Sequence, residues 1–128
     1  MNTLTRDEFL STISRIAGSV YDFHERFSVP MAHSPSSPEE SLVTLRNRLA
    51  FLMEEVGEHA KELNKGNLED AAIELADVAF VVLGTVLTLD VSGEQACLVV
   101  ARKNDSKTSE THAIEESSGK LVRRPVSR

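Results

Sequence analysis

With 128 residues, 41% of them hydrophobic and no tryptophan, the chain is long enough for one helical domain with its own core and needs no second domain. Residues 1–101 carry 7 basic against 16 acidic side chains, which argues against nonspecific binding to duplex nucleic acid or anionic membranes, whereas residues 102–128 carry 7 basic against 4 acidic and can attract a small phosphorylated ligand. The lone Cys97 excludes a disulfide framework and a cysteine zinc site, and the uncharged stretch at 78–89 is too short to span a bilayer, so we expect a cytoplasmic protein.

The first predicted helix covers residues 5 to about 27. Thr5 and Glu8 have the spacing of a capping box, in which each side chain satisfies a free backbone donor of the first turn. Residues 28–37 are rich in proline and serine and predict a loop. Apolar residues recur in the helix at three- and four-residue intervals and predict one face packed into a core, namely Phe9, Ile13, Ile16, Val20 and Phe23 or Phe27.

A long second helix is predicted from residue 38 to about residue 65. Ser37 is the expected N-cap, Pro38 occupies the first helical position, and Glu40 completes a capping box. Gly66 can adopt the left-handed conformation that ends a helix. The apolar stripe between these ends consists of Leu42, Leu45, Leu49, Leu52, Val56, Ala60 and Leu63.

The third predicted helix runs from Leu68 to about Leu89, with Asn67 as its N-cap. After its first turn, Glu74 and Asp77 are its only charged residues. A helix that is apolar nearly all round is expected to be central and buried.

A break at residues 90–93 should precede a fourth helix, with Ser92 as N-cap and Gln95 at the capping-box position. This helix should end between Asn104 and Lys107. From residue 108 onward the composition is polar and shows no sustained periodicity. We therefore expect a helical domain at 1–107 and a polar, basic C-terminal tail or flexible loop at 108–128.

Two helices carry acidic residues at helical spacing. Like charges three or four residues apart share a helix face and oppose folding by about 0.2–0.5 kcal/mol per pair, and burial raises that cost. A hard divalent cation, Mg²⁺ or Mn²⁺, would compensate such a cluster. On the second helix alone, a solvated acidic face explains the pattern equally well, but the pair on the third helix lies among apolar residues. The acidic residues are Glu54, Glu55, Glu58 and Glu62 on the second helix and Glu74 and Asp77 on the third.

Glu55-x-x-Glu58, fifteen residues, then Glu74-x-x-Asp77 resembles the double acidic motif of the MazG-like and dimeric dUTPase superfamily. The stretch Arg102–Lys107 is similar to the Asn and Lys that follow the last helix in its phosphoribosyl-ATP pyrophosphohydrolase-like branch. The dipeptide at 23–24 resembles that branch too. Together these similarities cover roughly residues 20–125.

The resemblance implies a four-helix, all-α MazG-like bundle completed by oligomerisation. It also implies hydrolysis of a (deoxy)nucleoside triphosphate between the α and β phosphates, giving a nucleoside monophosphate and pyrophosphate. Mg²⁺, with Mn²⁺ as the alternative, would support this chemistry. The implied metal ligands are Glu55, Glu58, Glu74 and Asp77.

Glu54 remains as the carboxylate that would orient or deprotonate the attacking water, because the other four match the ligand motif. By the same resemblance, Asn104 and Lys107 would bind phosphate or sugar oxygens, and Phe23 and His24 would contact the base. For Arg46 and Arg48 we expect surface pairing with nearby glutamates.

Three other functions are weighed against a house-cleaning nucleotide pyrophosphohydrolase. One is phosphoribosyl-ATP hydrolysis in histidine biosynthesis. Another is a ferritin-like di-iron oxidoreductase, which requires Glu-x-x-His on two helices, whereas His59 follows Glu55 by four residues. The third is a non-enzymatic metal-binding interaction module, against which the acidic pair in an apolar helix argues.

We expect a homodimer or homotetramer. The apolar third helix and the run Ala96–Ala101, which has no polar residue, need more cover than four helices of one chain provide. The pattern does not identify the preferred base.

Overall fold

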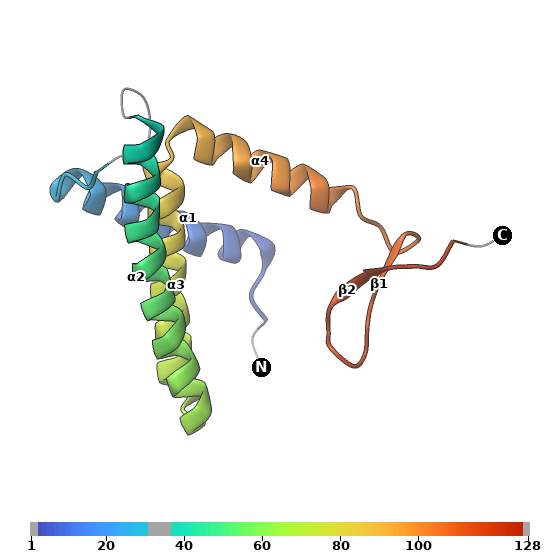
Figure 1. Ribbon diagram of the computed structural model, residues 1–128. Coiled ribbons are helices and arrows are strands. Elements are labelled where there is room, and N and C mark those ends of the chain that lie inside the picture. The colour runs from blue at the N-terminus through green and yellow to red at the C-terminus, as the bar shows by residue number, and fades with distance from the viewer. Residues whose placement is uncertain (1–2, 31–36, 127–128) are drawn as a thin grey trace. The chain divides into compact units, whose positions relative to one another are not determined.

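The computed structural model describes residues 3–30 and 37–126. The chain forms two compact units, residues 1–94 and 95–128, and each is described by itself. The expected boundary after residue 107 stays a prediction. The predicted helical fold is confirmed: within the described residues the elements are α1 (Arg6–Arg26), α2 (Pro38–Lys65), α3 (Leu68–Thr88), α4 (Val91–Asp105), β1 (His112–Ile114) and β2 (Leu121–Arg123) (Figure 1).

The capping signals of the first two helices are confirmed. The Thr5 hydroxyl accepts a hydrogen bond from the backbone N–H of Glu8 at 3.1 Å, and the Ser37 hydroxyl accepts one from Glu40 at the same distance. Both capping boxes are complete, because the glutamate carboxylate accepts from the N-cap backbone in each case. Of the loop expected at 28–37, residues 31–36 lie outside the described residues.

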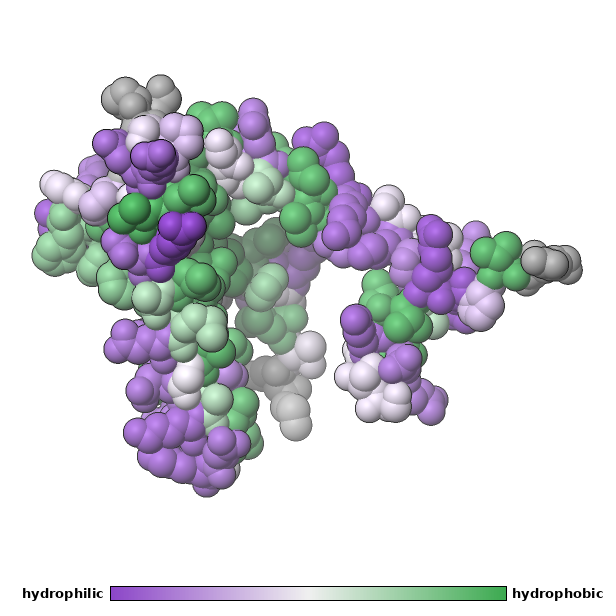
Figure 2. Space-filling model, viewed as in Figure 1, coloured by the Kyte–Doolittle hydropathy of each residue, from purple (hydrophilic) through white to green (hydrophobic). Residues whose placement is uncertain are grey.

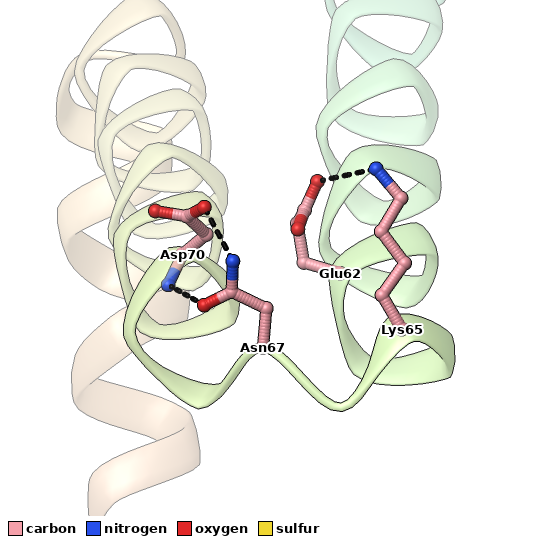
Figure 3. A network of polar contacts seen from close by, with 4 residues as sticks. All are labelled: Glu62, Lys65, Asn67 and Asp70. Carbon is pink, nitrogen blue, oxygen red and sulfur yellow. Dashed lines mark hydrogen bonds and ion pairs between the residues drawn. The ribbon is translucent and has the colours of Figure 1, made fainter.

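A two-residue turn joins α2 to α3. Gly66, with a φ of 75°, ends α2 in the left-handed conformation, and Asn67 caps α3 by accepting from the Asp70 N–H at 3.2 Å. Figure 3 shows both ends of this turn: the Asn67 amide also donates to Asp70 at 2.6 Å, and Lys65 pairs with Glu62 at 3.5 Å. So tight a turn makes the two helices antiparallel neighbours.

Side by side, α2 and α3 form the centre of the first unit (Figure 1). A hydrogen bond of 2.7 Å links the His59 ring on α2 to the carbonyl of Ala71 on α3, and Ala71 is only 2% exposed. Helix α1 packs on α3 through Val20, through His24 and through an edge-on contact between the rings of Phe23 and Phe80. Both predicted metal-binding helices therefore belong to one helical hairpin.

The start of the fourth helix was predicted wrongly. Helix α4 begins at Val91, so Ser92 lies inside it and does not cap it. Asp90 adopts a φ of 56°, and its carbonyl accepts the first helical hydrogen bond from Glu94 at 3.1 Å. The chain turns at Asp90 itself, and Gly93 allows the close approach, since a Cβ there would strike the carbonyl of Val86.

Within one chain, α3 is not the buried helix that its composition predicts. Only Ala71, Gly84 and Thr88 are buried in it, and 17% of its most apolar window is covered. Most of the apolar stripe predicted on α1 is exposed too. Val20 is 2% exposed and belongs to the core, whereas Phe9 is 52% exposed and lies outside it. Figure 2 shows apolar residues at the surface of the helical unit. Among the described elements, α1 and α2 are the helices that pack along α3, and they leave most of its apolar surface exposed.

Judged by length and composition alone, α3 is also long and apolar enough to cross a membrane. The core helix of a soluble bundle meets the same criterion. Glu74 and Asp77 in its first half favour the bundle helix over a membrane span, since charged residues are costly in a bilayer.

The C-terminal segment expected as a tail or flexible loop contains a short hairpin. Strands β1 and β2 pair antiparallel, with Ala113 opposite Val122. Gly119, with a φ of 71°, lies in the connecting turn. Strands of three residues are too short for alternating hydrophobicity to show in a sequence, which explains why this element was missed.

Candidate metal centre

Three carboxylates converge from the two central helices. Glu55 lies on α2, and Glu74 and Asp77 lie one turn apart on α3. One oxygen from each carboxylate lies within 4.8 Å of the others. We call these three residues the acidic trio. The antiparallel α2–α3 hairpin produces this meeting, because it places the middle of α2 beside the first half of α3.

The electrostatics of the acidic trio are unfavourable without a cation. Partial desolvation, followed by the charges of Asp77, Glu54 and Glu58, raises the pKa of Glu55 above its ordinary value. Desolvation and then the neighbouring charges of Asp77, Glu55 and Glu58 raise the pKa of Glu74, and a hydrogen bond from its carboxyl to Asp77 adds to the effect. In residues 3–30 and 37–126, no basic side chain forms an ion pair with the trio.

Glu58 and Glu54 lie at the border of the trio. Both are exposed on α2, and both contribute to the field that raises the pKa of Glu55. Glu58 also acts on Glu74 across the helix pair. The structure thus brings three of the four expected ligands together. The fourth, Glu58, lies one helical turn from Glu55 on α2, and Glu54 lies next to Glu55 in the chain.

The donors of the acidic trio suit a hard cation. All three are carboxylate oxygens, the ligand type that Mg²⁺, Mn²⁺ and Ca²⁺ prefer. His59 is held by the carbonyl of Ala71 through Nδ1 and is not part of the group. This arrangement fits a carboxylate-bound divalent metal and lacks the histidines of a ferritin-like di-iron centre.

Phe23 and His24, the expected base-contacting residues, lie where α1 crosses α3. The Phe23 ring packs against Phe27, with centroids 4.7 Å apart, and edge-on against Phe80, with centroids 5.5 Å apart. Phe80 follows Asp77 by three residues on α3, so the α1 residue Phe23 packs against α3 about one helical turn from Asp77. His24 is only 7% exposed, and its Nδ1 has no hydrogen-bond partner in the described part of the chain.

Arg48 does not pair with surface glutamates as expected. Its Nε donates to the hydroxyl of Thr85 at 3.1 Å and its Nη2 donates to the carbonyl of Val81 at 3.2 Å. Burial lowers the pKa of Arg48, and burial and then Arg48 lower the pKa of His24. Gly84 leaves room for both, since a Cβ there would lie 2.9 Å from Nε2 of His24. In the sequence, Gly84 followed by Thr85 inside an apolar helix was the feature that could have indicated these polar contacts of Arg48.

Asn104 and Lys107 belong to the second unit. The Lys107 ammonium donates to the side-chain oxygen of Asn104 at 3.1 Å, and the Asn104 amide donates to the carbonyl of Val100 at 2.9 Å. Both line a pocket of about 550 Å³ formed with residues of the C-terminal hairpin. The two residues therefore act as one polar pair at the end of α4.

Comparison with known proteins identifies the family. A sequence model described as phosphoribosyl-ATP pyrophosphohydrolase matches residues 20–104, more than half of the chain, including the whole α2–α3 hairpin and the acidic trio. No curated protein and no solved structure matches the chain. Members of this family are pyrophosphohydrolases of nucleotides and generally use a divalent metal. The chain belongs to the phosphoribosyl-ATP pyrophosphohydrolase family, within the MazG-like all-α nucleoside triphosphate pyrophosphohydrolase superfamily.

Proposed function

We propose that the protein hydrolyses a nucleoside triphosphate between the α and β phosphates, releasing a nucleoside monophosphate and pyrophosphate, with Mg²⁺ as cofactor. The observation that carries the proposal is the acidic trio, whose oxygens approach within 4.8 Å from two helices without a basic partner in the described chain. Folding such a cluster costs free energy, and a cation that binds it offsets the cost. Family membership identifies the reaction class.

The residues divide into holding and orienting roles. Glu55, Glu74 and Asp77 would hold the metal, and Glu58, one turn further along α2, would supply a fourth carboxylate. Mg²⁺ bound there would supply positive charge to offset the charge that develops on the phosphate oxygens. Glu54, exposed and beside Glu55, orients the attacking water and accepts its proton.

For the substrate, we favour a house-cleaning role on noncanonical or surplus nucleoside triphosphates. Hydrolysis of phosphoribosyl-ATP is the second candidate, and the description of the matching family favours it. Both substrates present an α–β phosphoanhydride bond to the same carboxylates, so the acidic trio does not separate them. The residues that contact the base would distinguish the two substrates. Phe23, beside Phe80, offers an aromatic surface for stacking on a base.

The test is a panel of nucleoside triphosphates and phosphoribosyl-ATP, each incubated with Mg²⁺, with Mn²⁺ or with EDTA. We expect monophosphate and pyrophosphate as products, and no turnover in EDTA. Glu62→Gln is the control for substitutions in the trio, because Glu62 is an acid on α2, the helix of Glu55, and pairs with Lys65. Release of orthophosphate and a nucleoside diphosphate, or full activity in EDTA, would contradict the proposal.

We also propose that the active protein is a homo-oligomer, a dimer or a tetramer. Exposed apolar side chains on α1, α2 and α3 support this, since monomers seldom leave so many uncovered. A second copy supplies a matching apolar face by symmetry.

A further inference from the structure

A small pocket lies between the segment that follows α1 and the first half of α2, within the first compact unit. Its volume of about 210 Å³ is smaller than the roughly 300–1,000 Å³ of pockets that enclose whole drug-sized ligands, so it suits a single ring system. We call it the α2 pocket. Its lining residues are Val29, Pro30, Thr44, Asn47, Arg48 and Phe51.

Phe51 gives the α2 pocket an aromatic wall. Its side chain is 52% exposed, and its ring contacts no other aromatic ring within residues 3–30 and 37–126. The Phe23 ring, in contrast, packs against the rings of Phe27 and Phe80. Pro30 adds apolar surface from the segment after α1. A nucleobase can stack on an open ring such as that of Phe51, because every base has a flat π face.

Polar side chains of the α2 pocket keep unused hydrogen-bonding groups. In the part of the chain that the structure describes, the Asn47 amide and the Thr44 hydroxyl have no hydrogen-bond partner. Arg48 donates through Nε and Nη2 to Thr85 and Val81, which leaves Nη1 as a further donor. An amide carries a donor and an acceptor side by side, which is the pattern that pairs with the polar edge of a base.

The α2 pocket and the acidic trio lie along the same side of α2. Asn47, Phe51 and Glu55 follow one another at four-residue intervals, and residues at this spacing share a helix face. Phe51 and Glu55 are therefore about 6 Å apart along the helix axis. In a nucleotide only the sugar separates the base from the α phosphate. A base that stacks on Phe51 thus directs its phosphates toward Glu55.

We propose that the α2 pocket binds the base of the nucleotide, with Phe51 stacking on the ring and Asn47 pairing with its polar edge. This inference rests on the proposed function and specifies how its substrate is recognised. By turning its amide, Asn47 presents an oxygen to an amino base or an NH₂ group to a keto base. The pocket therefore accepts both classes of base, as a broad nucleotide pyrophosphohydrolase requires.

The experiment is a titration of the full chain with nucleosides in EDTA, followed by backbone amide NMR. A nucleoside has a base and no phosphate, and EDTA removes metal, so the acidic trio makes no contribution. The probes are two matched pairs at millimolar concentration, adenosine with inosine and cytidine with uridine, and the members of each pair differ by an amino or a keto group. We expect shifts concentrated at residue 29 and residues 44–51 for all four.

Two variants with matched controls test the two contacts. Phe51→Leu should weaken binding of every nucleoside about tenfold, because the stacking ring is lost. Phe9→Leu removes an equally exposed ring from α1 and should leave binding unchanged. Asn47→Asp replaces the NH₂ donor with an acceptor, so inosine and uridine should weaken about tenfold relative to adenosine and cytidine. Asn64→Asp makes the same change at an exposed position near the end of α2 and should leave these ratios unchanged.

The inference is overturned by the absence of shifts at the α2 pocket, or by equal weakening in Phe51→Leu and Phe9→Leu. Wild-type ratios of amino to keto nucleosides in Asn47→Asp would also overturn it. Amide spectra of the free variants report whether α2 remains folded. Nucleotide turnover with Mg²⁺ is measured separately. Nucleoside binding at the α2 pocket without turnover would leave the base pocket standing and refute the proposed function, whereas turnover without such binding would do the reverse.

Discussion

Asp77 is the exposed member of the acidic trio, so its charge can be removed with little disturbance of packing. Asp77→Asn keeps the shape of the side chain and replaces a charged oxygen ligand with a neutral one. We expect turnover to fall by more than about 100-fold, since even residues that only support metal ligands typically contribute ~10–100-fold to affinity or activity. Pyrophosphate release with Mg²⁺ measures the effect.

The same substitution should move metal-free stability in the opposite direction. Removing one negative charge relieves the like-charge repulsion that Asp77 exerts on Glu74 and Glu55. In EDTA the variant should melt at or above the wild-type temperature, while Mg²⁺ should stabilise the wild type alone. Normal turnover, or a sharp loss of stability in EDTA, would assign Asp77 a purely structural role. Glu62→Gln should show neither change.

His24 predicts a pH dependence of stability that is separate from the acidic trio. Burial and then Arg48 hold the pKa of His24 below its ordinary value of 6.5 in the folded protein. Below that pH the unfolded chain binds a proton at His24 that the folded chain does not, so the free energy of unfolding decreases as the pH falls toward the folded pKa. Above pH 6.5 His24 is neutral in both the folded and the unfolded chain, so this loss of stability is absent there.

The measurement compares melting of the wild type and of His24→Gln in EDTA from about pH 7.5 to about pH 5. All carboxylates titrate in both proteins, so the difference between the two curves reports His24. We expect the wild-type advantage to shrink as the pH falls. A difference that stays constant over this range would mean that His24 is not kept neutral by its surroundings.

At the scale of single elements, the two ends of α3 show what sequence patterns can and cannot predict. Asn67 caps one end as predicted, because a capping side chain bonds to backbone atoms only three residues away. At the other end the prediction of Ser92 as a cap was wrong, because the turn depends on Asp90 adopting a φ of 56°. Non-glycine residues seldom adopt such a φ, and the contact with Val86 that accompanies it is tertiary.

The site follows the same division. Glu55, Glu74 and Asp77 were predictable because helical spacing and a short turn nearly dictate their meeting. The hydrogen bonds of Arg48 were not, because they depend on which residues of α2 and α3 lie opposite each other. Its true partners, a hydroxyl and a backbone carbonyl, have no charge pattern to reveal them.

Gly93 gives an element-scale prediction about the junction of α3 and α4. Gly93→Ala places a Cβ against the carbonyl of Val86, a backbone atom that cannot rotate away, so we expect a loss of about 1–3 kcal/mol in unfolding free energy. Gly18→Ala is the control. A Cβ at Gly18 has open space inside α1, and alanine there should stabilise the helix by roughly 0.5–1 kcal/mol. Denaturant unfolding of both variants measures this contrast, and equal effects would refute the close contact at Gly93.

At the scale of the whole molecule, the exposed apolar stripe of α1 predicts self-association. Phe9 and Ile13 keep the spacing of a core-facing stripe, yet within one chain they remain 52% and 39% exposed. Burying such side chains against a second copy gains about 25 cal/mol per Å² of apolar surface removed from water. We expect light scattering at micromolar concentration to give a mass at least twice that of the 14.1 kDa chain.

Two variants of α1 make this test specific. Phe9→Lys should lower the measured mass, because it places a charge in the apolar stripe that a second copy would cover. Ser11→Lys puts the same charge on the opposite face of α1, two residues further along the helix, and should leave the mass unchanged. Circular dichroism of both variants establishes that α1 remains helical. A wild-type protein that is monomeric at micromolar concentration and fully active would show that one chain makes a complete site, and the exposed stripe would then need another explanation than a second copy.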